Sequence, residues 1–67
     1  MTVDEAIATA DRIKDRLRAC ETVAEIDLVA AEERATVRAL AETAEGKPLA
    51  HQISNLKIYM LWQIRGR

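Results

Sequence analysis

Apolar residues recur along most of this chain at the three- and four-residue spacing of an amphipathic α-helix. Three such runs cover about residues 3–19, 23–44 and 48–64. No segment shows the sustained alternation of apolar and polar residues that is typical of a β-strand. The pattern therefore predicts an all-α fold, a small up-down-up three-helix bundle that forms a single domain over residues 1–67.

Short polar motifs mark where the first two helices begin. The segments TVDE, residues 2–5, and TVAE, residues 22–25, match the capping box in which Ser or Thr precedes Glu by three positions. In such a box the Thr hydroxyl accepts from the Glu amide, and the Glu carboxylate accepts from the Thr amide. We therefore expect helices to start directly after Thr2 and Thr22.

The segment EGKP, residues 45–48, separates the second helix from the third. Gly46 suits the left-handed conformation that often follows a helix, and Pro48 suits the first turn of the next helix. The second helix is thus predicted to continue to Ala44.

Helical-wheel positions assign one apolar arc of each helix to the core. In the first helix the arc comprises Val3, Ala6, Ile7, Ala10, Ile13, Leu17 and Cys20. In the second it comprises Ile26, Val29, Ala30, Val37, Leu40, Ala41 and Ala44. In the third it comprises Leu49, Ile53, Leu56, Met60, Leu61 and Ile64.

The second helix carries a further apolar stripe outside this arc. Its members are Ala24, Leu28, Ala31, Ala35 and Ala39. Two apolar stripes suit a helix that touches both neighbours inside a three-helix bundle, and this interpretation is the simpler one. The alternative is a close-packed alanine seam against a second copy of the chain.

The third helix is also partly apolar on the side away from its core arc. That side carries His51, Asn55, Ile58, Tyr59, Trp62 and Arg65. Trp and Arg are enriched at protein–protein hot spots because they combine a large contact area with directed hydrogen bonds. This set is therefore a predicted partner-binding face, although Trp62 could instead close the edge of an alanine-rich core.

Size and composition point toward association. The chain has 67 residues, of which 49% are hydrophobic and none is Phe. A domain this small buries only about 60% of the surface that its unfolded chain exposes, so its stability as a monomer is marginal. We expect self-association, most simply as a homodimer, or a protein partner.

Charge is distributed unevenly along the chain. Residues 1–45 hold all 11 acids and six of the 10 Lys and Arg residues, a net charge of −5, whereas residues 46–67 hold four bases and no acid. In a homodimer the basic third helix would face the acidic residues Glu21, Glu25, Asp27, Glu32 and Glu33 of the other copy.

The alternative partner is a nucleic acid. Its phosphates would contact Lys47, Lys57, Arg65 and Arg67, and its bases would stack on Tyr59 or Trp62. Four bases are few, and the pI of about 5.7 is far from that of a typical nucleic-acid-binding domain. The sequence therefore favours a protein partner.

Enzymatic motifs are absent from the sequence, and we expect no catalytic activity, cofactor or metal. Glu33 lies within a core stripe, where we expect either a partly buried ion pair with Lys14 of the first helix or two side chains that reach separately toward water. His51 is the single His, too few for a two-His metal site, and the single Cys20 is expected to be structural. If the protein were an enzyme, Glu33, Arg34 and Arg38 would be the first residues to test.

The remaining expectations concern location and role. No apolar run approaches the length of about 20 residues that spans a bilayer, so we expect no membrane insertion. Asp4 and Glu5 stand where a signal peptide needs bases, and a lone Cys suits a reducing cytoplasm. Small helical proteins without catalytic motifs often serve as accessory, adaptor or inhibitor factors, and we expect a role of this kind.

Overall fold

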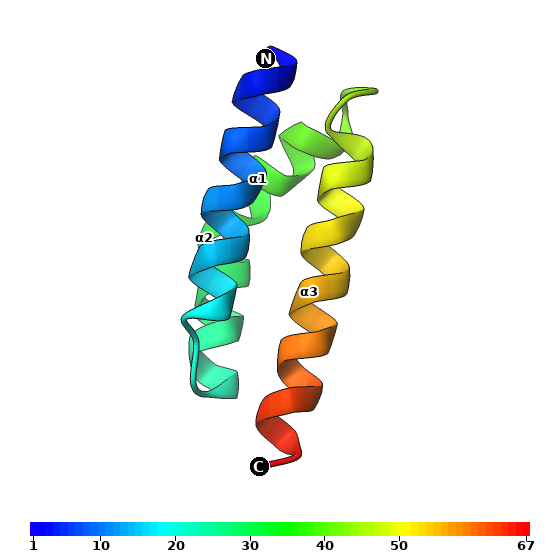
Figure 1. The fold of residues 1–67 in the computed structure, drawn as a ribbon. Helices are drawn as coiled ribbons and strands as arrows, with labels where there is room; N and C mark the ends of the chain where they lie inside the picture. Colours follow the sequence, from blue (N-terminus) through cyan, green and yellow to red (C-terminus); the bar gives the residue numbers. More distant parts are fainter.

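The computed structural model describes residues 1–67 and contains three α-helices and no strand. Helix α1 spans Val3–Arg18, α2 spans Val23–Ala41 and α3 spans Lys47–Arg65. Successive helices run in opposite directions, the up-down-up arrangement that was predicted, so that the N-terminus lies at one end of the bundle and the C-terminus at the other (Figure 1). The predicted fold class is confirmed.

Both predicted helix starts are confirmed, and each is capped by its threonine. The Thr2 hydroxyl accepts from the Glu5 amide at 3.1 Å, and the Thr22 hydroxyl accepts from the Glu25 amide at 3.1 Å. Neither return bond forms as predicted: Thr2 and Glu5 share only the bond from the Glu5 amide, and the Glu25 carboxylate makes a different bond. Glu25 Oε1 accepts from the Thr22 hydroxyl, also at 3.1 Å, rather than from the Thr22 amide.

The second helix ends three residues earlier than predicted. The Thr43 hydroxyl donates to the Leu40 carbonyl at 3.0 Å and accepts from the Gly46 amide at 2.9 Å. This side chain therefore takes over hydrogen bonds that a continuing helix would make through its backbone. As a result α2 and α3 have the same length, 19 residues.

Gly46 is needed for close packing rather than for a left-handed backbone. Its φ of −86° and ψ of −19° are right-handed, so the predicted left-handed conformation is wrong. A Cβ at this position would collide with the Leu40 carbonyl oxygen and lie 2.7 Å from Thr43 Oγ1. Pro48 lies in the first turn of α3, as predicted.

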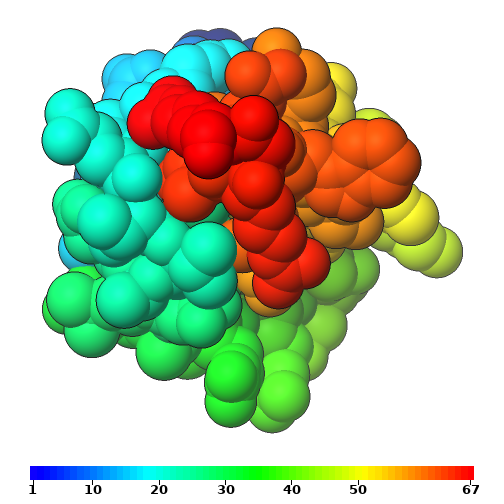
Figure 2. Space-filling view, turned by 90° about the horizontal axis from the view of Figure 1, so that it is seen from below, coloured from blue at the N-terminus to red at the C-terminus, as the bar shows by residue number.

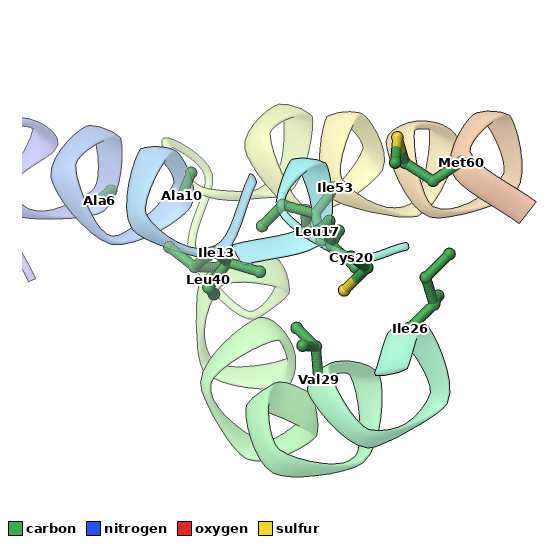
Figure 3. Close-up of a cluster of buried hydrophobic side chains, with 11 residues drawn as sticks. Ala6, Ala10, Ile13, Leu17, Cys20, Ile26, Val29, Leu40, Ile53 and Met60 are labelled. Atoms are coloured by element: carbon green, nitrogen blue, oxygen red, sulfur yellow. The ribbon is translucent and has the colours of Figure 1, made fainter. Parts of the chain in front are cut away.

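The core is a single cluster of eleven buried hydrophobic residues from all three helices and from Cys20 (Figure 3). Its largest fully buried side chains are Ile13, Leu17, Ile26 and Leu40. Most predicted core positions are confirmed, but Val3 and Ile7 are 53% and 44% exposed. Ala41 and Ala44, predicted as core residues of the second helix, are exposed too. Over the first turns of α1, Ala6 and Ala10 are buried, as predicted.

Candidate partner-binding face

The outer side of α3 presents all six residues predicted to contact a partner. His51, Asn55 and Arg65 are exposed, and Ile58 and Tyr59 are 55% and 57% exposed. Trp62 is 76% exposed, the largest value among the large hydrophobic residues.

Trp62 therefore does not close the core, and that alternative is wrong. The inward positions at this level of α3 belong to Met60, which is buried, and to the half-buried Leu61 and Ile64. Because Trp62 lies on the opposite side of the helix, its indole projects into solvent. Figure 2 shows the end of α3 at the surface of the molecule, beside the start of α2.

The alanine stripe of α2 also lies on the surface. All five of its members are exposed, and Leu28 is 60% exposed. The interpretation that this stripe packs against a neighbouring helix within the bundle is therefore wrong. The stripe and the α3 face therefore lie on the outward sides of two different helices.

An ion-pair network joins α1 to α2 at Glu33, the one charged residue that is buried. Arg12 Nη1 donates to Glu33 Oε1 at 3.0 Å, and Arg16 Nη1 donates to the same oxygen at 3.3 Å. Oε2 is buried and lies 2.8 Å from Arg12 Nη2, yet it accepts no hydrogen bond. Arg16 also donates to Glu32, at 2.8 Å.

The predicted pairing of Glu33 with Lys14 is therefore wrong. Lys14 donates to Gln52 of α3 at 3.1 Å and lies 3.5 Å from Asp11. Arg12 and Arg16 are one turn apart on α1, and together they take the side of α1 that meets α2. Lys14 points instead toward α3.

The environment of Glu33 is that of a structural carboxylate. The hydrogen bond from Arg12 is the main cause that lowers the pKa of Glu33, against the opposing effect of burial, and the charges of Arg12 and Arg16 add to it. A general acid at neutral pH needs a pKa shifted in the other direction. Glu33 thus suits an ion pair better than proton transfer.

Cys20 and His51 offer little chemistry where they lie. Cys20 is buried, and its Sγ donates to the Arg16 carbonyl at 3.3 Å. Burial, and next the negative charge of Glu25, raise the pKa of the Cys20 thiol. Because the thiolate is the reactive form, this environment disfavours nucleophilic chemistry. His51 is exposed, and no group of three His, Cys, Asp or Glu residues is placed to hold a metal ion.

One feature of the surface was not predicted: the cations divide into two groups. The four cations of α1 all form ion pairs, and their partners are acids of α1 and α2. No cation of α2, α3 or the C-terminal residues forms one; these are Arg34, Arg38, Lys47, Lys57, Arg65 and Arg67. The net charge of +4 over residues 46–67 was a partial signal, but it did not reveal that Arg34 and Arg38 belong to the same group.

No known protein family, curated protein or solved structure matches this chain. None of the three helices is both long and apolar enough to cross a bilayer.

Proposed function

We propose that this protein is a non-catalytic interaction module that self-associates as a homodimer through the outer face of α3. The observation that carries the proposal is the exposure of Trp62, at 76%, on a face that also holds Ile58 and Tyr59. Covering these three side chains would remove a large apolar area from water, and a central Trp ringed by polar residues is typical of an interface hot spot.

The polar residues of the face would orient the two copies relative to each other. His51, Asn55 and Arg65 flank the apolar residues along α3 and can donate or accept hydrogen bonds at the rim of an interface. Arg65 forms no ion pair within the chain, so its charge is free to meet an acid of a second copy. Of the acidic residues first considered for that role, Glu32 and Glu33 are already paired, which leaves Glu21, Glu25 and Asp27.

The wider role that we propose is that of an accessory, adaptor or inhibitor factor in a reducing, cytoplasmic compartment. Cys20 is unpaired and buried, which suits a compartment in which disulfides do not form. The alanine stripe of α2 would provide a second, smaller contact in the same assembly.

Sedimentation velocity over a range that reaches high micromolar concentration tests the proposal. We expect a dimer for the wild type and a monomer for Trp62→Ala. Gln63→Ala is the matched control, because Gln63 is exposed beside Trp62 but lies outside the proposed face. A wild type that remains a monomer over the whole range would contradict self-association, and a Trp62→Ala dimer would contradict the proposed face.

Nucleic-acid binding is the second candidate function. It is favoured by the unpaired bases Lys47, Lys57, Arg65 and Arg67, which share α3 and its C-terminal extension with two exposed aromatic residues. Fluorescently labelled DNA and RNA at low and moderate salt provide the test, because phosphate contacts weaken steeply as salt rises. Absence of binding at low salt would eliminate this candidate.

A further inference from the structure

The seam between α2 and α3 is hollowed into two adjoining clefts. The first, of about 200 Å³, opens between Val37 and Arg34 of α2 and Ser54 and Lys57 of α3. Arg34, Val37 and Ser54 line the second cleft as well, so the two clefts adjoin. The second cleft extends the hollow past Arg38 toward the start of α3.

The rim of this double cleft is basic along its whole length. Arg34 and Arg38 lie on the α2 side, and Lys47 and Lys57 lie on the α3 side. None of the four forms an ion pair within the chain. Lys47 and Lys57 are ten positions apart on one helix, so the basic rim is about 15 Å long.

The floor of the cleft is apolar, with one balanced charge. Side chains of Ile13, Leu17, Val29 and Ile53 line it. The carboxylate of Glu33 also faces the first cleft, but Arg12 and Arg16 neutralise it from the α1 side. The cleft thus combines an apolar floor with a rim of four positive charges that have no counter-charge.

We propose that this cleft binds an acidic amphipathic segment of a partner protein. Apolar side chains of the segment enter the floor between α2 and α3, and its carboxylates meet Arg34, Arg38, Lys47 and Lys57 along the rim. The proposal goes beyond the α3 contact face: of the six residues of that face only His51 lines the cleft, whereas the hydrophobic residues Ile58, Tyr59 and Trp62 do not. Either proposal can therefore fail while the other stands.

Two properties of the cleft favour a peptide over other anions. A rim about 15 Å long suits an extended or helical segment better than a single small anion. An apolar floor suits Leu-like side chains, whereas a phosphate backbone would leave that floor uncovered. The net charge of −1 for the whole chain likewise disfavours a polyanion of high charge density.

Fluorescence anisotropy with two synthetic peptides tests the proposal. The first is a labelled amphipathic peptide of Glu and Leu, about four helical turns long, and the second has Gln in place of every Glu. We expect the wild-type protein to bind the acidic peptide at low salt, to bind the Gln peptide at least about tenfold more weakly, and to lose affinity as salt rises. Failure of the wild type to bind the acidic peptide would overturn the proposal.

Substitutions of the rim residues test whether the acidic peptide binds in the cleft. We expect Arg34→Ala with Arg38→Ala, on the α2 side of the rim, to weaken acidic-peptide binding about tenfold. We expect the same loss from Lys47→Ala with Lys57→Ala, on the α3 side. Arg67→Ala is the matched control, since Arg67 is an unpaired cation that does not line the cleft, and we expect unchanged binding. Circular dichroism verifies that each variant is folded, and two independent double variants ensure that one misfolded protein does not end the test.

Three further outcomes would also overturn the proposal. The first is wild-type affinity in both double variants. The second is a labelled single-stranded oligonucleotide that binds as tightly as the acidic peptide and is weakened by the same substitutions, which would assign the cleft to a nucleic acid. The third is conversion of a wild-type dimer to a monomer by Arg34→Ala with Arg38→Ala, which would place a second copy in the cleft. A Trp62→Ala variant that still binds the peptide as well as the wild type is expected, because Trp62 does not line the cleft.

Discussion

The contact between α1 and α2 and the cleft between α2 and α3 contain similar side chains in opposite states. At the first, Arg12 and Arg16 meet Glu32 and Glu33 at 2.8 to 3.3 Å. At the second, Arg34 and Arg38 meet no acid, although Arg34 directly follows Glu33 in the chain. The difference arises because a step of one residue turns a helix by about 100°, which is enough to move a side chain from one neighbour to the other.

The paired charges at the contact between α1 and α2 stabilise the fold, whereas the cations at the cleft form no ion pair within the chain. An ion pair that includes a buried carboxylate resists removal of its cations, because an unpaired buried charge is costly. Exposed cations without partners contribute little to folding, so their removal is expected to leave the stability of the monomer nearly unchanged.

The largest expected effect follows removal of both arginines that face Glu33. In Arg12→Ala with Arg16→Ala, the Glu33 carboxylate, whose residue is 8% exposed in the wild type, loses its partners, which costs about 3 kcal/mol for that carboxylate. Urea unfolding at pH 7 measures the change in the free energy of unfolding. Glu33→Leu provides the comparison, and we expect a smaller loss, because an apolar side chain of similar size needs no partner and leaves both arginines free to reach water.

A smaller effect is expected when the same contact is titrated with acid. Because the pKa of Glu33 is lowered in the folded protein, its ion pairs stabilise the fold above the unfolded-state pKa of about 4.3. That stabilisation is lost as the pH falls from about 5 through the folded-state pKa. Urea unfolding at several pH values should therefore show that the wild type exceeds Glu33→Gln in stability near pH 7 and that the difference shrinks in acid. A difference that does not change with pH would contradict the ionised state of Glu33.

The smallest effect is expected at the cleft. Arg34→Ala with Arg38→Ala should change the free energy of unfolding by no more than about 0.5 kcal/mol, since both side chains are exposed and unpaired. The same urea titration measures it, with the Arg12 and Arg16 double variant as the positive reference. A loss as large as that of the reference would show that the two pairs of arginines do not differ in role.

Much of the fold is predictable because its signals are local. Thr2 and Thr22 cap their helices through residues only three positions away, and Pro48 lies in the first turn that its ring geometry favours. The exposure of Trp62 and its neighbours was also visible, although the sequence left the alternative of a core Trp open. Wheel positions alone do not reveal whether a second apolar side of a helix has a neighbour.

The errors lie where contacts across the bundle decide the outcome. The end of α2 depends on the side chain of Thr43, and the need for glycine at position 46 depends on the distance to the Leu40 carbonyl. The choice of Arg12 and Arg16 over Lys14 as partners of Glu33 depends on how far α1 is rotated about its own axis. None of these three features can be predicted from a short local stretch of the sequence.

By itself the sequence determined three amphipathic helices, their order, their starts and the residues on the outer face of α3, because these follow from spacing along a helix and from capping over three positions. The tertiary structure alone decided which cations are neutralised and which are free, and it created the cleft between α2 and α3. The physical reason is that ion pairs between helices, and a cleft between helices, depend on the relative rotation and tilt of the packed helices. The packing of the whole core sets that rotation and tilt.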